Sequence, residues 1–334
     1  MTSSAIYGCL GLTLTEAEKR FFAESDPWGF IIFARNIETP EQVRALTSDL
    51  RATVGWNAPI LIDQEGGRVA RLRPPHWRSY PPARRFGDIY ATSASDGLTA
   101  ARLGAQLIAL ELRDVGVDID CLPVLDVPVP GAHDVIGNRA YGEIPEVVSA
   151  LGEAAMEGAL AGGVLPIIKH IPGHGRAGVD SHEKLPIVDT DRETLSTTDF
   201  APFSVLADAP LAMTAHVIYS AIDAENPATT SSTVISEIIR DEIGFSGALM
   251  SDDLSMKALG GSFEERTKAS LDAGCDLVLH CNGDMDEMKA VAKEARTLSG
   301  TSAARADQAL TMRTDPERVD LEDLIHRFSS LVSL

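Results

Sequence analysis

Short apolar runs recur along the whole chain, and stretches with the spacing of amphipathic helices lie between most of them. Most of the runs are almost continuously apolar, as parallel strands are when both of their faces are buried. We expect strands at residues 7–12, 29–33, 59–63, 117–121, 164–169, 211–216, 248–252 and 276–280. Eight strands that alternate with helices predict an α/β fold of the (β/α)8, or TIM-barrel, class.

Helix starts are visible between the expected strands. Thr39 is followed by Pro40 at the first helical position and by Gln42 at the third, which is a capping pattern. A stripe of apolar residues with helical spacing follows it. The same capping pattern predicts helix starts at Thr190 with Glu193 and at Ser262 with Glu265.

The alternative to a barrel is a doubly wound open sheet. Such a sheet usually has a glycine-rich phosphate loop after its first strand, and residues 8–11 do not supply one. No linker-like stretch divides the chain, so we expect residues 1–334 to form a single barrel domain. The polar, helix-like tail from about residue 299 is expected to pack on the outside of the barrel.

Composition argues against several classes of partner. The 334 residues are 44% hydrophobic, enough for a large core, and carry a formal net charge of −20. An acidic surface does not attract nucleic acid or anionic membranes, and no apolar run approaches the length of a membrane span. The four cysteines lie in or beside apolar runs without a Cys-x-x-Cys pair, and the N-terminus lacks signal-peptide features. We therefore expect a cytoplasmic protein with reduced cysteines.

The stretch from Lys169 to His182 contains most of the chemistry. Lys169 and His170 end the fifth expected strand, and a loop rich in glycine and proline follows them. The loop closes with Asp180 and His182, two residues apart, so the carboxylate is able to reach the imidazole. Glycines allow such a loop to approach a ligand closely and to move. A structural role stays open, and so does a metal site, because His170, His174, Asp180 and His182 are all of metal-ligand type.

Polar residues also follow other expected strands, where a barrel has its functional residues. Asp63 ends the third strand and Arg71 comes soon after it, while Arg139 lies beyond the fourth. Asp63 is either an acceptor for sugar hydroxyls or half of a scaffold ion pair, and Arg139 is either a ligand clamp or a surface charge. Asp252 and Asp253 suit a helix N-cap as well as catalysis. With the Asp180 loop on the same rim, catalysis is favoured.

Several of these segments, in the same order, resemble a known family. Lys-His-x-Pro-Gly-His-Gly at 169–175, with Asp-Ser-His at 180–182, is similar to the signature of the single-domain bacterial β-N-acetylhexosaminidases of glycoside hydrolase family 3, which act in peptidoglycan recycling. The resemblance extends through segments 63–69, 123–127, 215–220, 251–256 and 272–276. Ile171 stands where Phe is frequent, and residues 140–142 and 176–178 fall in variable parts.

The resemblance implies a TIM barrel and a retaining hydrolase that removes terminal N-acetylglucosamine from muropeptides by double displacement. It implies Asp252 as the nucleophile and Asp180 with His182 as the acid/base pair. It also implies five residues that bind the N-acetylglucosamine unit: Asp63, Arg71, Arg139, Lys169 and His170. It requires no metal and no cofactor, its partner is a small carbohydrate, and a monomer is favoured.

This chemistry agrees with the residue types. A retaining glycosidase needs one nucleophilic carboxylate and one group that first gives and then takes a proton. An imidazole, with an ordinary pKa near ~6.5, works in both directions around neutral pH. A neighbouring carboxylate orients it and favours its protonated form. Sugar-binding side chains at a closed end of the pocket predict action on terminal sugars.

Three alternatives remain open at this point. One is a metal-dependent hydrolase on the same barrel that uses His170, His174 and His182. Another is a sugar-binding protein without turnover, which the presence of both Asp252 and His182 disfavours. The third is a phosphorylase of the same family, in which phosphate replaces water as the acceptor.

Overall fold

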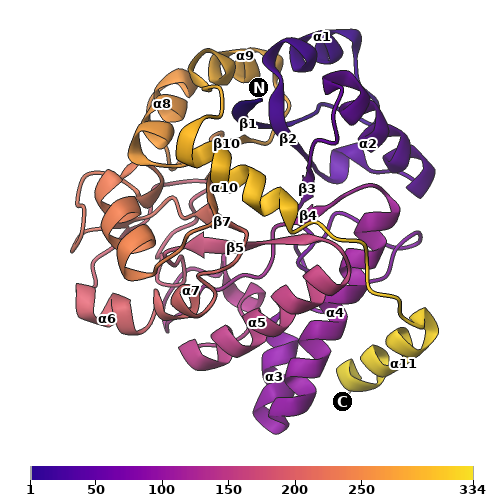
Figure 1. The fold of residues 1–334 in the computed structure, drawn as a ribbon. Coiled ribbons are helices and arrows are strands. Elements are labelled where there is room, and N and C mark those ends of the chain that lie inside the picture. The colour runs from indigo at the N-terminus through magenta and orange to yellow at the C-terminus, as the bar shows by residue number, and fades with distance from the viewer. Residues whose placement is uncertain (1, 334) are drawn as a thin grey trace.

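A computed structural model describes residues 2–333 of the chain, and eight parallel strands close into a barrel within them (Figure 1). Neighbouring barrel strands follow one another in chain order. They are β1 (Ser3–Gly8), β2 (Pro27–Ile32), β3 (Ile60–Ile62), β4 (Ile119–Asp120), β5 (Leu165–Ile171), β7 (Leu211–Thr214), β9 (Ala248–Asp253) and β10 (Leu277–His280). A short parallel pair, β6 (Ile187–Val188) and β8 (Ile218–Tyr219), forms a separate sheet. The expected (β/α)8 fold is confirmed.

Helices surround the barrel between its strands (Figure 1). They are α1 (Glu16–Ser25), α2 (Pro40–Val54), α3 (Arg84–Thr92), α4 (Ala94–Asp114), α5 (Pro145–Ala161), α6 (Arg192–Thr197), α7 (Ala201–Val205), the π-helix η4 (Val234–Glu242), α8 (Phe263–Ala273) and α9 (Met285–Glu294). Three single 3₁₀ turns, η1 (Ala34–Asn36), η2 (Gly137–Arg139) and η3 (Ala228–Thr230), lie in the loops.

Two of the three predicted helix starts are correct. Helix α2 begins with its threonine cap, and Ser262 and Glu265 form a reciprocal capping box at the start of α8. The start predicted at Thr190 is wrong, because the cap of α6 is Asp191, one residue later. The Asp191 carboxylate accepts hydrogen bonds from both the amide and the hydroxyl of Thr194, at 2.9 and 2.8 Å. A carboxylate also interacts favourably with the helix dipole, which a threonine hydroxyl does less well.

The first strand differs most from its prediction, because β1 begins four residues before the expected segment 7–12. Its start is polar, and Ser4 pairs there with a segment distant in the sequence. The Ser4 amide donates to the Arg296 carbonyl at 2.7 Å, and Ser4 Oγ accepts from the Arg296 amide at 3.0 Å. The apolar Leu10, which belongs to the expected segment, is exposed in the loop after β1. Hydrophobicity alone therefore misplaces this strand.

The two tail helices lie in different places. Helix α10 (Gly300–Thr311) crosses one end of the barrel, and its Ala306 and Ala309 join the apolar cluster that fills the barrel interior (Figure 1). Helix α11 (Leu321–Val332) packs against α3 and α4, where Phe328 contacts Tyr80 and Phe86. Helix α11 thus lies against outer helices, whereas the small alanines of α10 allow it to pack against the barrel end.

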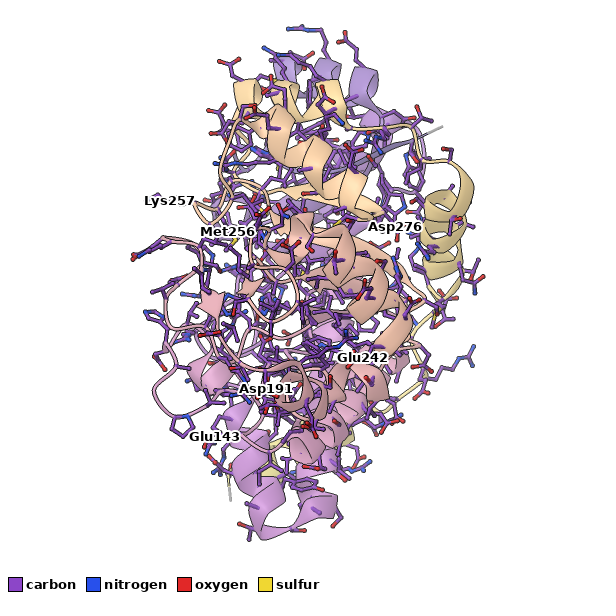
Figure 2. All side chains as sticks on the ribbon, turned by 90° about the vertical axis from the view of Figure 1, so that its left-hand side faces the viewer. Glu143, Asp191, Glu242, Met256, Lys257 and Asp276 are labelled. Carbon is purple, nitrogen blue, oxygen red and sulfur yellow. The ribbon has the colours of Figure 1, made fainter. Side chains whose placement is uncertain are left out.

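The opposite end of the barrel is the one at which barrel enzymes have their active sites, where the strands finish. Figure 2 shows both ends from the side: Asp276, just before β10, lies on one side, and Met256 and Lys257, after β9, lie on the other. Among residues 2–333, no helix is both long and apolar enough to cross a membrane.

Candidate active site

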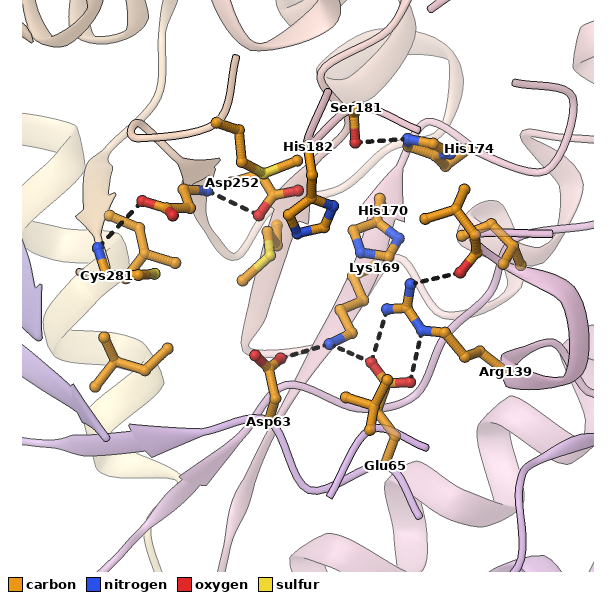
Figure 3. Close-up of a pocket in the computed structure, with 18 of the residues that line it drawn as sticks. Asp63, Glu65, Arg139, Lys169, His170, His174, Ser181, His182, Asp252 and Cys281 are labelled. Carbon is orange, nitrogen blue, oxygen red and sulfur yellow. Dashed lines mark hydrogen bonds and ion pairs between the residues drawn. The ribbon is translucent and has the colours of Figure 1, made fainter. Parts of the chain in front are cut away.

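A pocket of about 240 Å³ opens at the carboxyl ends of the barrel strands (Figure 3). Segments far apart in the sequence line it, chiefly the loops after β3 and β4, the end of β5 with its following loop, and the end of β9. Seven of the eight predicted site residues line this pocket: Asp63, Arg71, Arg139, Lys169, His170, His182 and Asp252. The eighth, Asp180, is hydrogen-bonded to His182. The fold thus brings the predicted set together.

Lys169 is a buried cation that joins two carboxylates. Its ammonium lies 2.8 Å from Asp63 Oδ1 and 2.7 Å from Glu65 Oε1. Asp63 also accepts a hydrogen bond from Arg71 Nη2 at 3.1 Å. Both oxygens of Glu65 are bound by the guanidinium of Arg139, at 2.8 and 2.9 Å, and such bidentate pairing fixes orientation as well as position. These five residues are called the ion cluster below.

Charge pairing outweighs burial in the ion cluster. Burial alone raises the pKa of a carboxyl and lowers that of an amine. Against this effect, Lys169 and Arg71 hold the pKa of Asp63 well below its usual range, and Arg139 with Lys169 lowers the pKa of Glu65 from 4.5 to about 2. The two carboxylates likewise outweigh burial and raise the pKa of Lys169. Both carboxylates and the ammonium are therefore charged at neutral pH.

Asp126, at full burial, links β5 to the loop that follows it. Its Oδ2 lies 2.7 Å from His170 Nδ1, and its Oδ1 accepts from the backbone amides of His170 and His174 at 3.2 and 2.7 Å. Burial opposes ionisation, but the imidazole of His170 and these hydrogen bonds lower the pKa of Asp126 to about 2. The result is a fixed orientation for His170, whose side chain lines the pocket.

The two acids at the end of β9 have different surroundings. Asp253 accepts from the Ser255 amide at 3.0 Å and from the Cys281 amide at 3.1 Å, so it supports its own loop. Asp252 accepts from the Asp253 amide at 2.7 Å and presents its carboxylate to the pocket (Figure 3). Burial opposes its ionisation, but the imidazoles of His216 and His170 lower the pKa of Asp252. Asp252 is thus an ionised carboxylate in the pocket.

His182 and Asp180 lie on the loop after β5, at the rim of the pocket. Asp180 Oδ1 lies 2.8 Å from His182 Nδ1 and accepts from the His182 amide at 2.9 Å. Burial opposes the ionisation of Asp180, but these hydrogen bonds lower the pKa of Asp180. The His182 side chain is 67% exposed, and its ring lies on the same side of the pocket as Asp252 (Figure 3). Because Asp180 holds Nδ1, Nε2 is the ring nitrogen left to exchange a proton.

Two carboxylates with little exposed side-chain surface, Glu65 and Asp126, are not among the predicted site residues. Both follow strands that end at the pocket, Glu65 after β3 and Asp126 after β4. Asp126 comes directly after the apolar segment 121–125. An acid that directly follows an apolar segment is rarely buried unless it has a partner. This position in the sequence could have identified Asp126.

The histidines of the site do not share one metal-binding geometry. His170, His174 and His182 are hydrogen-bonded to three different partners. Across the described part of the chain, no group of three or more His, Cys, Asp or Glu side chains is arranged to hold a metal ion. The metal-dependent alternative needs these three histidines around one ion, and they are not gathered in that way in this structure.

Comparison with known proteins finds relatives over most of the chain. Residues 12–312 match the family described as "Glycosyl hydrolase family 3 N terminal domain". A Bordetella avium protein named "Beta-hexosaminidase" is 40% identical over 279 residues, which cover 81% of this chain and 78% of the relative. A protein of the same name from Thiobacillus denitrificans is 41% identical over 281 residues, covering 81% of this chain and 76% of its own.

Solved structures of similar proteins cover almost the whole chain. NagZ from Neisseria gonorrhoeae in complex with N-trifluoroacetyl-D-glucosamine superposes with a TM-score of 0.88 at 31% identity and covers 99% of this chain and 98% of NagZ. A family 3 β-N-acetylglucosaminidase from Paenibacillus sp. gives a TM-score of 0.87 at 30% identity, over 98% of this chain and 67% of that protein.

Fold, site and comparisons together define the class of protein, a glycoside hydrolase. The chain belongs to glycoside hydrolase family 3. Within that family its activity is that of a β-N-acetylhexosaminidase.

The ion cluster predicts a pH-dependent contribution to stability. The pKa of Glu65 is lowered from 4.5 to about 2 on folding, so its contribution is fully present above about pH 4.5 and is lost as the pH falls toward 2. We expect Glu65→Gln to lower the free energy of unfolding by about 3 kcal/mol at pH 7, and by progressively less below pH 4.5. Urea denaturation at several pH values measures this difference.

Glu183→Gln, on an exposed residue, is the matched control and should change little at any pH. A Glu65→Gln effect of equal size at pH 7 and pH 3 would show that Glu65 contributes through packing and not through its charge.

Proposed function

We propose that this enzyme is a retaining exo-β-N-acetylglucosaminidase that removes terminal N-acetylglucosamine from peptidoglycan fragments by double displacement. The observation that supports this most is that Asp252 and His182 face one pocket whose inner end is the ion cluster. A nucleophilic carboxylate and a proton donor beside a sugar site are what retaining glycoside hydrolysis requires.

The sugar is bound first, at the ion cluster. Asp63 accepts hydrogen bonds from sugar hydroxyls, and Arg71, Arg139 and Lys169 donate to sugar oxygens. His170 contributes through the ring that Asp126 orients. Because the charged side chains already hold one another, they keep their positions before the sugar arrives, and little ordering remains to be done on binding.

Two chemical steps follow. The Asp252 carboxylate attacks the anomeric carbon while the bond to the leaving oxygen breaks, and that oxygen receives the proton from His182 Nε2. Water then attacks the glycosyl-enzyme, gives its proton back to His182 and releases Asp252, so the β configuration is retained. Asp180 stabilises the imidazolium that is present before the first step and again after the second, and it keeps Nδ1 occupied throughout.

The difference in exposure between the two reacting groups supports these roles. Asp252 lies at the end of a barrel strand, where its position is fixed and its pKa is lowered, as a nucleophile ionised at neutral pH requires. His182 is exposed on a loop, where a departing group and an incoming water both have access. An acid/base that meets two different partners needs that access.

The leaving part of the substrate lies outside the pocket. A pocket of about 240 Å³ with a closed, charged inner end holds a single sugar at a chain terminus. For the remainder we propose a muramyl-peptide fragment, as the family resemblance implies. Its breakdown in the cytoplasm suits the four free, buried cysteines, which fit a reducing compartment.

The substrate proposal is tested with defined glycans. We expect release of N-acetylglucosamine from the non-reducing end of a short peptidoglycan fragment and from p-nitrophenyl N-acetyl-β-glucosaminide, with little action on the matching glucoside. Chromatography of the products distinguishes the outcomes. Internal fragments from a long glycan chain would contradict exo action, and sugar 1-phosphate formed in the presence of phosphate would favour the phosphorylase alternative.

The nucleophile is tested by Asp252→Asn. We expect kcat to fall by about 10³-fold or more with an unchanged thermal unfolding temperature, because the glycosyl-enzyme no longer forms. A 2-fluoro or 5-fluoro glycosyl reagent should label Asp252, as identified by peptide mass spectrometry. Labelling of Asp253 would show that the neighbouring acid is the nucleophile.

The acid/base pair is tested by the leaving group. His182→Ala should slow substrates with poor leaving groups by about 10²–10⁴-fold, because these need a proton as the bond breaks. Activated aryl glycosides should lose less in the first step, so covalent enzyme should accumulate, and azide should restore turnover and give a β-glycosyl azide. Asp180→Ala should show a weaker form of this pattern. Equal slowing of both substrate types, without azide rescue, would assign His182 a positioning role.

A further inference from the structure

Ser181, which lies between the two members of the acid/base pair, is buried although its neighbours are not. The residue is 3% exposed, whereas His182 and Glu183 are exposed. Its hydroxyl lies 3.1 Å from His174 Nε2 (Figure 3), and its carbonyl accepts from the Ala258 amide at 3.2 Å. Ser181 is therefore a point at which an otherwise exposed segment is attached to the protein.

The partner of Ser181 belongs to the rigid first part of the same loop. The His174 amide donates to Asp126 Oδ1 at 2.7 Å, and the ring of His174 is in edge contact with that of His170. Next to it, Gly175 packs so closely on the backbone of Val127 that a Cβ would lie 2.0 Å from the Val127 carbonyl oxygen. His174 is thus held by the same carboxylate that orients the sugar-binding His170.

The second part of the loop has a different character. Gly178 has open space around it, and residues 182–184 are exposed. Ala258, the partner of the Ser181 carbonyl, lies in the loop that follows the proposed nucleophile in β9. The two contacts of Ser181 therefore connect the segment of the acid/base pair to His174, beside the sugar site, and to the loop after the proposed nucleophile.

We propose that His174 and Ser181 are positioning residues, whose side-chain hydrogen bond sets the Asp180–His182 pair against Asp252 for proton transfer. This proposal rests on the proposed roles of Asp252 and His182. Neither positioning residue exchanges a proton with the substrate. The bond acts by keeping His182 at the leaving oxygen for a larger fraction of the time, which is the arrangement that an efficient acid catalyst needs.

The competing explanation is that the bond only stabilises the fold. A purely structural bond, once lost, would lower the unfolding temperature and the amount of active enzyme, and it would slow all substrates equally. A positioning bond, once lost, slows those substrates that depend on proton donation and leaves sugar binding unchanged. Comparing leaving groups therefore separates the two.

The test compares four variants on two substrates. Ser181→Ala and His174→Met remove the bond, His174→Gln keeps a polar group near the place of Nε2, and Glu183→Ala is a control on an exposed neighbour. The substrates are 2,4-dinitrophenyl N-acetyl-β-glucosaminide, with a good leaving group, and N,N′-diacetylchitobiose, with a poor one. The inhibition constant of free N-acetylglucosamine and the unfolding temperature are measured for each variant.

We expect Ser181→Ala and His174→Met to lower kcat on the disaccharide about three- to tenfold more than on the aryl glycoside, the effect of one lost hydrogen bond. The inhibition constant of N-acetylglucosamine should change by less than about twofold, because the lost hydrogen bond is not one that holds the sugar. His174→Gln should recover part of the loss, and Glu183→Ala should match the wild type. Combining His174→Met with Ser181→Ala should add little to either single change, because both remove one interaction.

Equal losses on the two substrates would overturn the proposal, and so would additive losses in the double variant. The parallel His182→Ala experiment separates this failure from that of the proposed function. If His182→Ala shows its leaving-group pattern and Ser181→Ala does not, the acid/base assignment stands and the positioning role is wrong. If His182→Ala shows no such pattern, both are wrong.

Discussion

The placement of a full positive charge inside the rim of the barrel is the constraint on which the site depends. Lys169 has 2% of its side chain exposed, and an ammonium buried to this extent is stable only when it is paired. Its two partners come from the segment after β3, and one of them continues the network to Arg139 after β4. Three consecutive strand ends are thereby linked by charge. Removing one member would leave its partners buried without compensation.

This network distinguishes the proposed sugar site, whose side chains are held by several partners, from the proposed acid/base pair, which has few. The charged groups of the ion cluster hold one another in place, and Asp126 does the same for His170 by three hydrogen bonds. His182 has one side-chain partner, Asp180, and lies on an exposed stretch. On the proposed roles, the sugar-binding groups are preorganised, and the group that serves both reaction steps lies at the rim.

The sequence carried enough information for the barrel and for a set of residues that meet at one pocket, and its limits have physical causes. Continuous apolar runs located the parallel strands because burial on both faces leaves little room for polar residues. They failed at β1, where Ser4 is satisfied by Arg296, 292 positions away. The eight predicted site residues were recognisable because they end strands or close a glycine-rich loop. Glu65, Asp126 and the bond of Ser181 were missed, since pairing across the pocket depends on tertiary contacts that no local pattern records.

A histidine at the rim also suits the charge balance of this pocket. Asp63, Glu65 and Asp252 are already ionised within it, and their charges are balanced by the lysine and the arginines of the ion cluster. A carboxylic acid serving as proton donor would become one more anion beside Asp252 once it had given its proton, and like charges at short range oppose each other's ionisation. An imidazole becomes neutral at the same moment. Asp180 lies outside the pocket lining and balances the protonated form of His182. In the proposed mechanism, His182 therefore gives and takes its proton without adding a negative charge beside Asp252.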